Sequence, residues 1–257
     1  MKYDRQVKIK QMFMDRRQIS CKELCEQFDI SIETVRRDLA ELEEEGVIRR
    51  VYGGAVLSDN SEAPNPMKPW DTRIGLNNTE KVNIAREIIR YIEDGMTIAL
   101  DSGTTTLEIA RLLYLRKNLN IITNDIHTAQ LLSLNTDHTI YLVGGSVKKD
   151  DMITVGFLTT EFMKNFSHID LALVTADGFK EGIGDFNVDM GSLKAIMIEK
   201  ADKVYAALDH SKFSVSALYK VCGLTDLDLV VTGEKAPAEA IEQLKEAGIK
   251  VILVPCE

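Results

Sequence analysis

Residues 31–55 read SIETVRRDLAELEEEGVIRRVYGGA, and this stretch decides how the first part of the chain folds. Its apolar residues recur at three- and four-residue spacing, which is the pattern of a helix with one buried side. They are Ile32, Val35, Leu39 and Leu42. Ser31 suits a helix N-cap and Gly46 suits a helix end. We therefore expect a helix from Ser31 to about Glu45, and then a two-stranded hairpin that turns at Gly53–Gly54.

Two more helices are expected before this stretch. The first runs from about Asp4 to about Asp15 and is followed by a short extended piece. The second starts after Ser20, where the residues SCKE have the form of a capping box with Glu23 as its acidic member. The order is then helix, helix, turn, helix, hairpin. This order predicts a helix-turn-helix followed by a wing.

The arginines of the stretch stand outside the apolar side of the helix. Arg36 and Arg37 lie in its N-terminal half, the part of a recognition helix that enters the major groove of DNA. The planar guanidinium suits that position because it pairs with guanine O6 and N7 or with phosphate. A pair of arginines on one helix is more often a solvated face, but the order of the elements favours DNA binding. The candidate DNA contacts are Ser31, Thr34, Arg36, Arg37, Arg49, Arg50 and Tyr52.

Charge is divided unevenly along the 257 residues, whose formal net charge is -9. Residues 1–60 hold 11 Lys and Arg against 12 Asp and Glu, whereas the remaining residues hold 20 against 28. The acidic second part would repel a nucleic acid, so a contact with DNA requires a local basic face on the first part. The glutamates within residues 41–45 are expected at the far end of the helix, away from the groove.

The sequence indicates neither a membrane segment nor a metal or disulfide framework. No apolar run approaches the roughly 20 residues that span a bilayer, and the charged N-terminus lacks the apolar core of a signal peptide. We therefore expect a cytoplasmic protein. The four cysteines form no CxxC pair and have no histidine close by in sequence, so we expect buried or half-buried side chains. Neither a metal ion nor a cofactor is expected.

Residues 58–70 contain three of the five prolines of the chain, which is typical of a linker. We place a winged helix-turn-helix at residues 1–57, a linker at 58–72 and a second domain at 73–257. In this second domain, short apolar runs alternate with helical segments, which predicts an α/β fold with a mostly parallel sheet covered on both faces. Strands are expected at 96–101, 120–123, 139–145, 169–177, 203–209, 228–233 and 250–255. Helices are expected at 80–93, 105–115, 126–134, 156–166, 191–201 and 237–247.

The run LDSGTTTLEIARLL, residues 100–113, follows an expected strand and opens an expected helix. Gly103 allows a tight turn. The hydroxyls of Ser102 and Thr104–Thr106 join the unpaired N–H groups and the positive dipole end of the helix. This combination suits a phosphate group, although a turn rich in Ser and Thr is more often only a helix cap. The phosphate motifs GxxxxGK and GxGxxG are both absent.

Other loops also follow expected strands. Ligands of open parallel sheets bind outside the carboxyl ends of the strands, so we expect these loops to form one crevice with residues 101–106. Asp177 would accept hydrogen bonds from sugar hydroxyls, and Lys194 would neutralise a phosphate or bind hydroxyls. For each residue taken singly, a turn, cap or surface role is as common as a ligand contact. The candidate ligand contacts are Asp101, Ser102, Gly103, Thr104, Thr105, Thr106, Thr123, Asn124, Gly144, Gly145, Asp177, Gly178, Lys194, Asp209 and Lys212.

The run VRRDLAELEEEGVIRRVYGGA, residues 35–55, closely resembles the winged helix-turn-helix signature of the DeoR family of bacterial transcription regulators. The resemblance continues through most of the chain, with the later sensor motifs in family order. It implies a regulator of sugar metabolism, usually a repressor. The C-terminal domain would resemble ribose-5-phosphate isomerase and bind a phosphorylated sugar as effector, with DSGTTT as the phosphate-binding loop. Gly184–Asp185 and Asp189–Gly191 depart from the Thr-rich, Glu-containing stretch of many relatives, which leaves the sugar open.

The expected partners are double-stranded operator DNA, a phosphorylated sugar and further copies of the chain. One chain offers a single recognition helix and specific sites usually need two, so we expect a homo-oligomer. The resemblance implies a dimer or a tetramer.

Two other classes stay open. A sugar-phosphate isomerase needs a base, for which Asp177 is available, and an oxyanion-stabilising segment. The nearest match to the KGGG of isomerases is KEGIG at residues 180–184, so we expect no catalytic residues. A protein-interaction scaffold would use the wing on a protein partner, and a steep loss of binding with salt would favour DNA instead.

Overall fold

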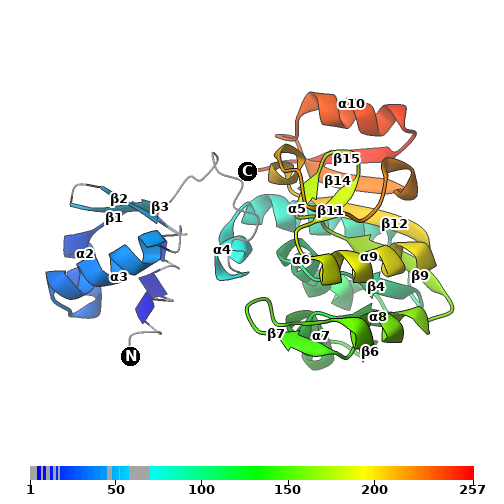
Figure 1. Cartoon of the computed structure of the whole chain (residues 1–257), viewed down its shortest axis with the longest axis horizontal. Coiled ribbons are helices and arrows are strands. Elements are labelled where there is room, and N and C mark those ends of the chain that lie inside the picture. Colours follow the sequence, from blue (N-terminus) through cyan, green and yellow to red (C-terminus); the bar gives the residue numbers. More distant parts are fainter. Residues whose placement is uncertain are drawn as a thin grey trace. The chain divides into compact units, whose positions relative to one another are not determined.

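The computed structural model of the chain describes residues 5–6, 8–9, 12–13, 16, 18–44, 48–51, 53–57 and 70–257. These residues form two compact units, both drawn in Figure 1. The first comprises the described residues up to Leu57 together with Asp71–Leu76, and the second comprises Trp70 and Asn77–Glu257. Tyr52, the side chain of Arg49 and residues 58–69 of the expected linker lie outside the described part of the chain.

Up to Leu57, the described residues of the first unit form helices α2 and α3 and a small sheet after the N-terminal helical residues. These elements are β1 (Gln18–Ser20), α2 (Cys21–Phe28), α3 (Ile32–Glu44), β2 (Ile48–Val51) and β3 (Gly54–Leu57). The strand order is β1-β3-β2, and both pairs are antiparallel. The predicted two-stranded hairpin is confirmed by the pairing of β2 with β3, and the extended piece before α2 adds a third strand that was not predicted. The described residues between Arg5 and Arg16 are helical, as predicted.

Local chemistry accounts for the turn between α2 and α3. The Ser20 hydroxyl accepts a hydrogen bond from the Glu23 N–H at 3.2 Å and caps α2. Asp29 ends that helix in the left-handed region, at φ 50°, which Asp adopts more readily than most residues. The Ser31 hydroxyl then accepts from the Thr34 N–H at 3.3 Å at the start of α3. Both predicted N-caps are confirmed.

The predicted apolar side of α3 forms the core of the first unit. Val35, Leu39 and Leu42 are buried and pack with apolar residues of α2 and of the small sheet. A Cβ at Gly54 would lie 2.3 Å from the Ile19 carbonyl oxygen. The close pairing of β1 with β3 therefore requires glycine at this position.

The second unit is built on a parallel sheet of seven strands in the order β15-β14-β12-β9-β4-β5-β6. All neighbouring pairs in this sheet run parallel, which confirms the predicted fold class. The strands are β4 (Thr97–Leu100), β5 (Asn120–Thr123), β6 (Thr139–Leu142), β9 (Ile169–Val174), β12 (Ala201–Leu208), β14 (Leu229–Gly233) and β15 (Lys250–Val254).

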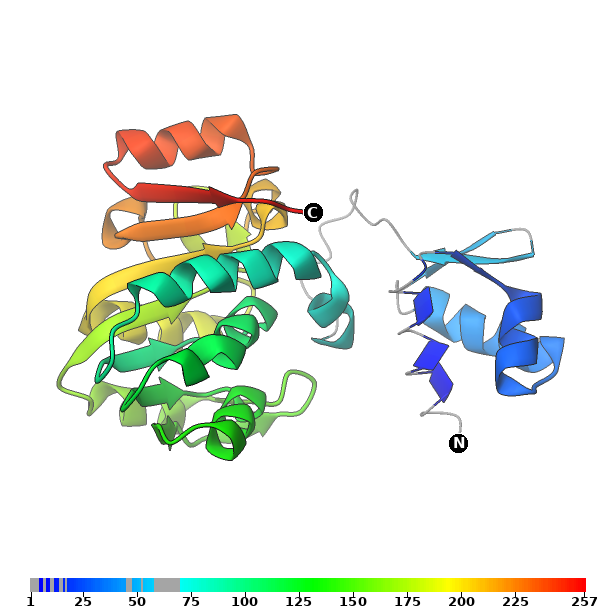
Figure 2. The same ribbon diagram turned by 180° about the vertical axis from the view of Figure 1, so that it is seen from behind.

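Helices cover both faces of this sheet, as Figures 1 and 2 show from opposite sides. One face packs against α5 (Asn78–Ile88), α6 (Thr104–Leu112) and α7 (Ile126–Asn135). The other packs against α8 (Phe157–Lys164), α9 (Val188–Lys200) and α10 (Ala238–Glu246). Alternate strand residues belong to two separate apolar cores, so nearly every residue of the inner strands β4, β5, β9 and β14 is buried. This explains why the strands read as unbroken apolar runs.

The strand order contains one reversal. From β4 the chain moves outward through β5 to β6, and from β9 it moves outward in the other direction through β12 and β14 to β15. The switch point therefore lies between β4 and β9. Loops at the carboxyl ends of these two strands diverge to opposite faces of the sheet, which makes the switch point the preferred ligand position in open α/β sheets.

Several short elements were not predicted, because segments of two to six residues carry too little periodicity. They are α4 (Trp70–Gly75), β7 (Ser146–Lys148), β8 (Ile153–Val155), β10 (Gly178–Phe179), β11 (Ile183–Asp185) and β13 (Tyr219–Lys220). The described residues also contain the 3-10 turns η1 (Ile89–Tyr91), η2 (Leu113–Leu115), η3 (His210–Ser214) and η4 (Leu224–Asp226). Helix α4 starts within the stretch expected as linker. Among the described residues, no helix has the length and apolar character needed to cross a membrane.

Candidate functional site

The outer face of α3 carries two arginines. Arg36 and Arg37 are exposed, and within the described part of the chain no hydrogen bond or ion pair holds either guanidinium. The neighbouring Asp38 is buried and accepts two hydrogen bonds from the Arg5 guanidinium, at 2.7 and 3.2 Å. This pairing raises the pKa of Arg5. Because Asp38 is turned into the interior, it does not cancel the positive charge of Arg36 and Arg37.

The wing holds one of its arginines against α3. Arg50 Nε donates to Glu43 Oε2 at 2.6 Å, and the Arg50 backbone N–H donates to Glu43 Oε1 at 2.8 Å. These bonds lower the pKa of Glu43. Glu43, one of the glutamates expected away from the groove, therefore reaches the wing. Ser31 and Thr34 lie at the first turn of α3, Ser31 exposed and Thr34 half-buried.

In the second unit, Asp101 lies at the switch point. It follows β4 directly, and its Oδ2 accepts hydrogen bonds from the Thr175 N–H at 3.0 Å and from the Thr175 hydroxyl at 3.1 Å. Thr175 follows β9 directly. The two residues therefore bridge the carboxyl ends of the strands between which the chain reverses its direction of winding.

Lys194 of α9 lies beside this bridge and is buried. Its Nζ is 3.0 Å from Asp101 Oδ2, 3.0 Å from Asp185 Oδ2, and donates to the Thr175 carbonyl at 2.8 Å. Burial opposes the charge on Lys194, but the carboxylates of Asp101, Asp185 and Asp177 outweigh it and raise the pKa of Lys194. Burial also raises the pKa of Asp185 to about 6, because Lys194 offsets only part of the cost. Lys194 is therefore a fixed, already paired cation at neutral pH.

The loop after β4 leads into an uncapped helix. Ser102 and Thr104–Thr106 are buried, and no side chain of the described residues caps the N-terminus of α6. A Cβ at Gly103 would lie 3.0 Å from the Thr175 hydroxyl, so the loop packs closely on the end of β9. The Thr106 hydroxyl donates to the Gly103 carbonyl at 2.9 Å, whereas the buried Ser102 hydroxyl has no hydrogen-bond partner. The first N–H groups of α6 are thus available to an anion.

The loop after β5 holds further buried polar groups beside Thr123. The Asn124 amide donates to the Thr154 carbonyl at 2.9 Å, but its Oδ1 has no partner. Asp125 caps α7 by accepting from the Thr128 N–H at 3.1 Å, whereas Asp125 Oδ2 and the Thr128 hydroxyl are also unpartnered. Burial raises the pKa of Asp125. Buried polar atoms without partners are rare in native proteins, so their gathering at two neighbouring strand ends points to a ligand.

Packing explains two of the remaining glycines that were predicted as ligand contacts, Gly145 and Gly178. A Cβ at Gly145 would lie 2.0 Å from the Thr159 hydroxyl of α8, and one at Gly178 would lie 2.5 Å from the Val215 carbonyl oxygen. Gly144 has open space around it. Asp177 Oδ2 accepts from the Phe186 N–H at 3.2 Å, so this carboxylate organises its own loop.

Asp209 lies two strands away from β4, at the end of β12. It accepts hydrogen bonds from the Ser211 N–H at 3.1 Å and from the Asn77 amide at 2.9 Å. Burial opposes its charge, but Lys212 and Lys81 prevail and lower the pKa of Asp209. Asp209 and Lys212 therefore attract each other electrostatically. They belong to a different part of the strand-end surface from Asp101.

A second buried carboxylate ties α5 to this part of the sheet. Glu80 Oε1 accepts from the His210 N–H at 2.7 Å and the Gly233 N–H at 3.0 Å, while Glu80 Oε2 lies 2.6 Å from His210 Nδ1. With Cys256, these side chains place three potential metal ligands within 4.8 Å of one another. Both Glu80 oxygens already accept hydrogen bonds, so the cluster acts as a clamp between elements. Cys21, Cys25 and Cys256 are half-buried and Cys222 is buried, which agrees with the expected burial of these side chains.

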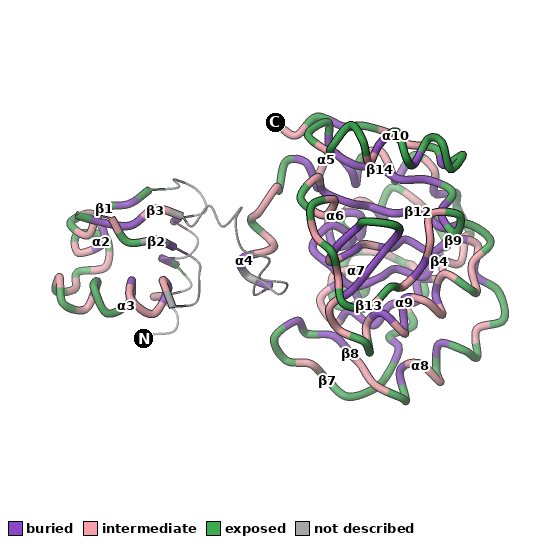
Figure 3. The backbone as a smooth tube through the Cα atoms, turned by 45° about the horizontal axis from the view of Figure 1, so that its top comes forward, coloured by how far each residue is buried: buried purple, intermediate pink, exposed green. Residues whose placement is uncertain are grey.

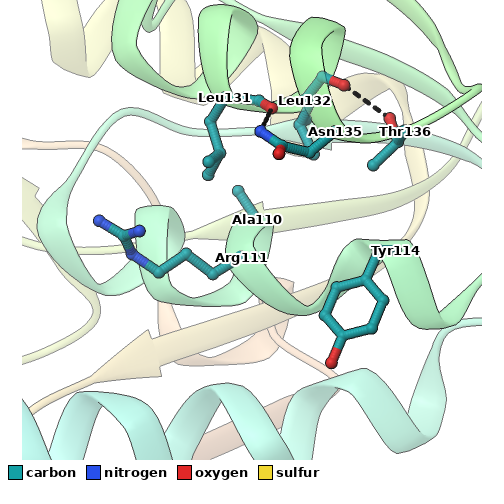
Figure 4. A pocket seen from close by; sticks show the side chains of 7 residues that line it. All are labelled: Ala110, Arg111, Tyr114, Leu131, Leu132, Asn135 and Thr136. Atoms are coloured by element: carbon teal, nitrogen blue, oxygen red, sulfur yellow. Dashed lines mark hydrogen bonds between the residues drawn. The ribbon is translucent and has the colours of Figure 1, made fainter.

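A pocket of about 370 Å³ opens between α6 and α7, as Figure 4 shows. It is lined by Ala110, Arg111, Tyr114, Leu131, Leu132, Asn135 and Thr136. These residues belong to the second halves of the two helices, whereas Ser102–Thr106 and Asn124–Asp125 lie at or before their first turns. The pocket is therefore separate from the strand-end site.

Sequence reasoning missed several residues that the structure adds to the site. Thr175 lies near the end of the strand expected at 169–177, and Asp125 lies two residues after the strand expected at 120–123, yet neither was predicted as a contact. Asp185 was seen only as a departure from a family pattern. Asn77 and Glu80 gave no signal, because their partners lie more than 120 residues away in the sequence.

Family comparisons cover both units. Residues 5–61 match the family described as the DeoR-like helix-turn-helix domain, and residues 76–234 match the DeoR C terminal sensor domain. The chain belongs to the DeoR family of transcription regulators. The prediction of this family and of a DNA-binding regulator is thereby confirmed.

Relatives of this DeoR-family regulator match it along almost its whole length. The HTH-type transcriptional regulator GolR of Listeria innocua is 33% identical over 251 residues, which is 97% of each chain. The glycerol-3-phosphate regulon repressor of Escherichia coli K12 is 32% identical over 91% of this chain and 92% of the relative. The repressor GlcR of Bacillus subtilis is 31% identical over 97% and 95%.

Solved structures resemble the regulator only distantly. A ribose-5-phosphate isomerase in complex with phospho-erythronic acid superimposes with a TM-score of 0.40 at 18% identity, over 53% of this chain and 54% of that chain.

Proposed function

We propose that this DeoR-family regulator represses an operon for the use of a sugar, and that a phosphorylated sugar bound at the β4–β9 switch point controls its affinity for operator DNA. The observation that carries the proposal is the meeting of the uncapped α6 N-terminus with buried, unpartnered polar atoms at that point. The names of two relatives support the chemistry: the glycerol-3-phosphate regulon repressor, and a putative repressor of the aga operon from Escherichia coli O157:H7, 30% identical over 98% of this chain.

The phosphate of the effector would lie at the start of α6. The free N–H groups of the first turn, the helix dipole and the hydroxyl of Ser102 all stabilise an anion there. Lys194 is held by carboxylates and is not free to approach the phosphate fully. Recognition of the phosphate would therefore depend mainly on backbone N–H groups and hydroxyls, which is consistent with a run of Thr104–Thr106 rather than basic residues.

The sugar end of the effector would face the loop after β5. Asn124 Oδ1 and Asp125 Oδ2 are acceptors without donors, and the hydroxyls of a sugar supply donors. Each unpartnered buried acceptor costs on the order of 1–3 kcal/mol, which a hydroxyl of the right position would recover. Donors at the α6 end and acceptors at the β5 end thus suit a molecule with one anionic and one polyol end.

Two contacts tie the residues that flank α4, both of them in the second unit, to the strand ends. Trp70, the first residue of α4, stacks on His127, which follows Asp125 by two residues. Asn77, just after α4, donates to Asp209. An effector that moves the loops after β5 and β12 would therefore act on both ends of α4. Such differential contact is what an effector needs in order to shift DNA binding.

We also propose that the site binds its ligand without turnover. Asp177, the candidate base, accepts a hydrogen bond from the loop backbone, and Lys194 is held in its charged form by two carboxylates. A lysine fixed as a cation cannot accept a proton from a sugar.

The test uses the full chain and a labelled duplex from the DNA upstream of its own gene. Binding is followed by fluorescence anisotropy while sugar phosphates and the matching unphosphorylated sugars are added. We expect one phosphorylated sugar to release the DNA, its free sugar to have no effect at the same concentration, and the phosphorylated sugar to remain chemically unchanged. Release by the free sugar alone, or release by no compound of a broad panel, would contradict the proposal.

A further inference from the structure

Three side chains that can bind a metal ion meet at the carboxyl ends of β12, β14 and β15. Glu80 comes from α5, His210 follows β12, and Cys256 follows β15. One donor atom of each side chain lies within 4.8 Å of the donor atoms of the other two. The three residues are far apart in the sequence, so the sequence alone did not predict a metal site here. Figure 3 shows the residues after β15 as exposed or intermediate, so an ion can reach the cluster from solvent.

Gly233, the last residue of β14, leaves room for the carboxylate and the thiol of this cluster. A Cβ at this position would lie 2.2 Å from Glu80 Oε1 and 2.5 Å from Cys256 Sγ. Gly233 belongs to a strand, and its φ lies outside the left-handed region, so its backbone conformation does not require glycine. The space that a side chain would fill is taken by two groups that bind metals.

Backbone hydrogen bonds orient two of the three side chains. Glu80 Oε1 accepts from the N–H groups of His210 and Gly233. The sulfur of Cys256 accepts from the Lys235 N–H. Both side chains can keep these bonds while they bind a metal, because a carboxylate and a sulfur each have further lone pairs. Hydrogen bonds of this kind hold metal ligands in position and strengthen metal binding.

A single hydrogen bond has to be exchanged for the metal. His210 Nδ1 and Glu80 Oε2 are 2.6 Å apart, and this bond joins α5 to the loop after β12 when no metal is bound. Zinc bonds of about 2.0–2.2 Å at a tetrahedral angle would place the two atoms about 3.4 Å apart. The atoms must therefore separate by less than about 1 Å. The side chain of His210 is 30% exposed, which leaves the imidazole room for this movement.

We propose that Glu80, His210 and Cys256 bind a zinc ion. Zinc takes carboxylate, imidazole and thiolate ligands, whereas magnesium and calcium prefer oxygen ligands alone. The carboxylate and the thiolate together balance the two positive charges of the ion, so little net charge is buried. The thiol releases its proton on binding, and the imidazole carries its proton on Nε2. Water takes the fourth position of the tetrahedral ion.

The ion holds the start of α5 against the loop after β12. Asn77 precedes Glu80 by three residues and donates to Asp209, the residue before His210. Zinc bound between Glu80 and His210 therefore strengthens a contact that already exists beside it. None of the three ligands belongs to the β4–β9 switch point, so zinc binding can be measured without effector or DNA.

The test adds zinc to the full chain with its thiols kept reduced and measures affinity by competition with a chromophoric chelator. We expect a dissociation constant below about 1 µM. Cobalt serves as a spectroscopic probe, because a bond between Co²⁺ and a thiolate gives a charge-transfer absorption that nitrogen and oxygen ligands do not give. Cys256→Ser keeps the size of the side chain and should remove this absorption. It should also weaken zinc binding at least about 10-fold.

Two control variants should bind zinc as the wild type does and keep the cobbalt absorption. Cys21→Ser with Cys25→Ser removes two other half-buried thiols, which lie one turn apart on α2. His168→Ala removes the histidine from an exposed group with Asp170 and Asp202, which could also attract zinc.

A wild type that binds zinc more weakly than about 1 µM, or a Cys256→Ser variant that keeps the wild-type affinity and absorption, would overturn the proposal. If Cys256→Ser does not fold by circular dichroism, His210→Gln replaces it with the same expected loss of zinc affinity. Effector titrations separate this proposal from the proposed function. A chain that binds zinc but responds to no sugar phosphate leaves the zinc site standing and removes the proposed function, whereas a chain that responds to a sugar phosphate but binds no zinc does the reverse.

Discussion

The indole ring of Trp70 stacks on the imidazole ring of His127, with ring centroids 5.1 Å apart and an angle of 19° between the planes. Trp70 is almost fully buried, and it is the single tryptophan of the chain. His127 lies in the first turn of α7, next to the loop that holds the unpartnered acceptors Asn124 and Asp125. The stack therefore holds Trp70 against the loop that borders the candidate effector site.

Replacing His127 should uncouple the effector from DNA binding. In His127→Ala the indole loses its stacking partner, so tryptophan emission should shift to longer wavelength as water reaches the ring. Affinity for operator DNA without effector should change less than about three-fold, whereas the effector-induced loss of affinity should shrink at least about five-fold, within the range of typical allosteric coupling. Anisotropy titrations with and without effector check both quantities. His168→Ala, an exposed histidine, is the control, and unchanged coupling in His127→Ala would refute the link.

Removing the two free arginines of α3 should abolish operator binding and leave the fold intact. Arg36→Ala with Arg37→Ala deletes two exposed cations that make no ion pair among the described residues. The free energy of unfolding should therefore change by less than about 0.5 kcal/mol. Affinity should fall at least about 100-fold, and the slope of log affinity against log salt should decrease by nearly two. Arg90→Ala with Arg111→Ala in the second unit is the matched control. Wild-type affinity in the α3 variant would show that this face does not touch DNA.

The sequence predicted the strands of the large sheet to within three residues at each end, and the reason is physical. A parallel strand covered on both faces must be apolar at almost every position, so runs such as NIIT and DLVVTG stand out against the amphipathic helices. The same argument located the loops after the strands. The helix starts were predicted equally well where a cap residue was present, as at Ser20 and Ser31.

The strand order and the charge network could not be predicted, because neither is local. Asp101 and Thr175 come together only through the pairing of β4 with β9, and nothing in either loop specifies that neighbour. Asp185 lies on β11, a strand of three residues that is too short to recognise in the sequence. Its buried carboxylate pairs with Lys194, which comes from helix α9. The pairing of β1 with the wing was not predicted for a similar reason, because a strand of three residues is too short to show a hydrophobic periodicity.

A negative charge at the start of α6 should make DNA binding insensitive to the effector. Thr104 is the first residue of α6 and buried, so Thr104→Glu would place a carboxylate against the N–H groups that the phosphate needs. Effector affinity should fall at least about 100-fold, while binding to operator DNA persists. Thr104→Gln has the same size without the charge and separates the loss of anion binding from crowding. Normal induction in Thr104→Glu would move the phosphate elsewhere.

Asp185 should weaken the fold as pH rises, which Asp185→Asn can reveal. Burial raises the pKa of Asp185 to about 6 in the folded chain, above the ordinary 3.8, so the folded state binds this proton more tightly than the unfolded state. Stability from this group is therefore present below pH 3.8 and is lost between about pH 4 and 6, by up to about 3 kcal/mol at 1.36 kcal/mol per pKa unit.

The asparagine variant has no such proton to lose. Its free energy of unfolding relative to the wild type should therefore improve by up to about 3 kcal/mol between pH 4 and 7, whatever the offset at pH 4 from the weaker partner for Lys194. Urea unfolding at pH 4, 5, 6 and 7 measures this difference, and Asp150→Asn at an exposed position supplies the flat reference. A difference that stays constant across these pH values would mean that Asp185 ionises as easily in the fold as outside it, and that Lys194 offsets the whole cost of burying its charge.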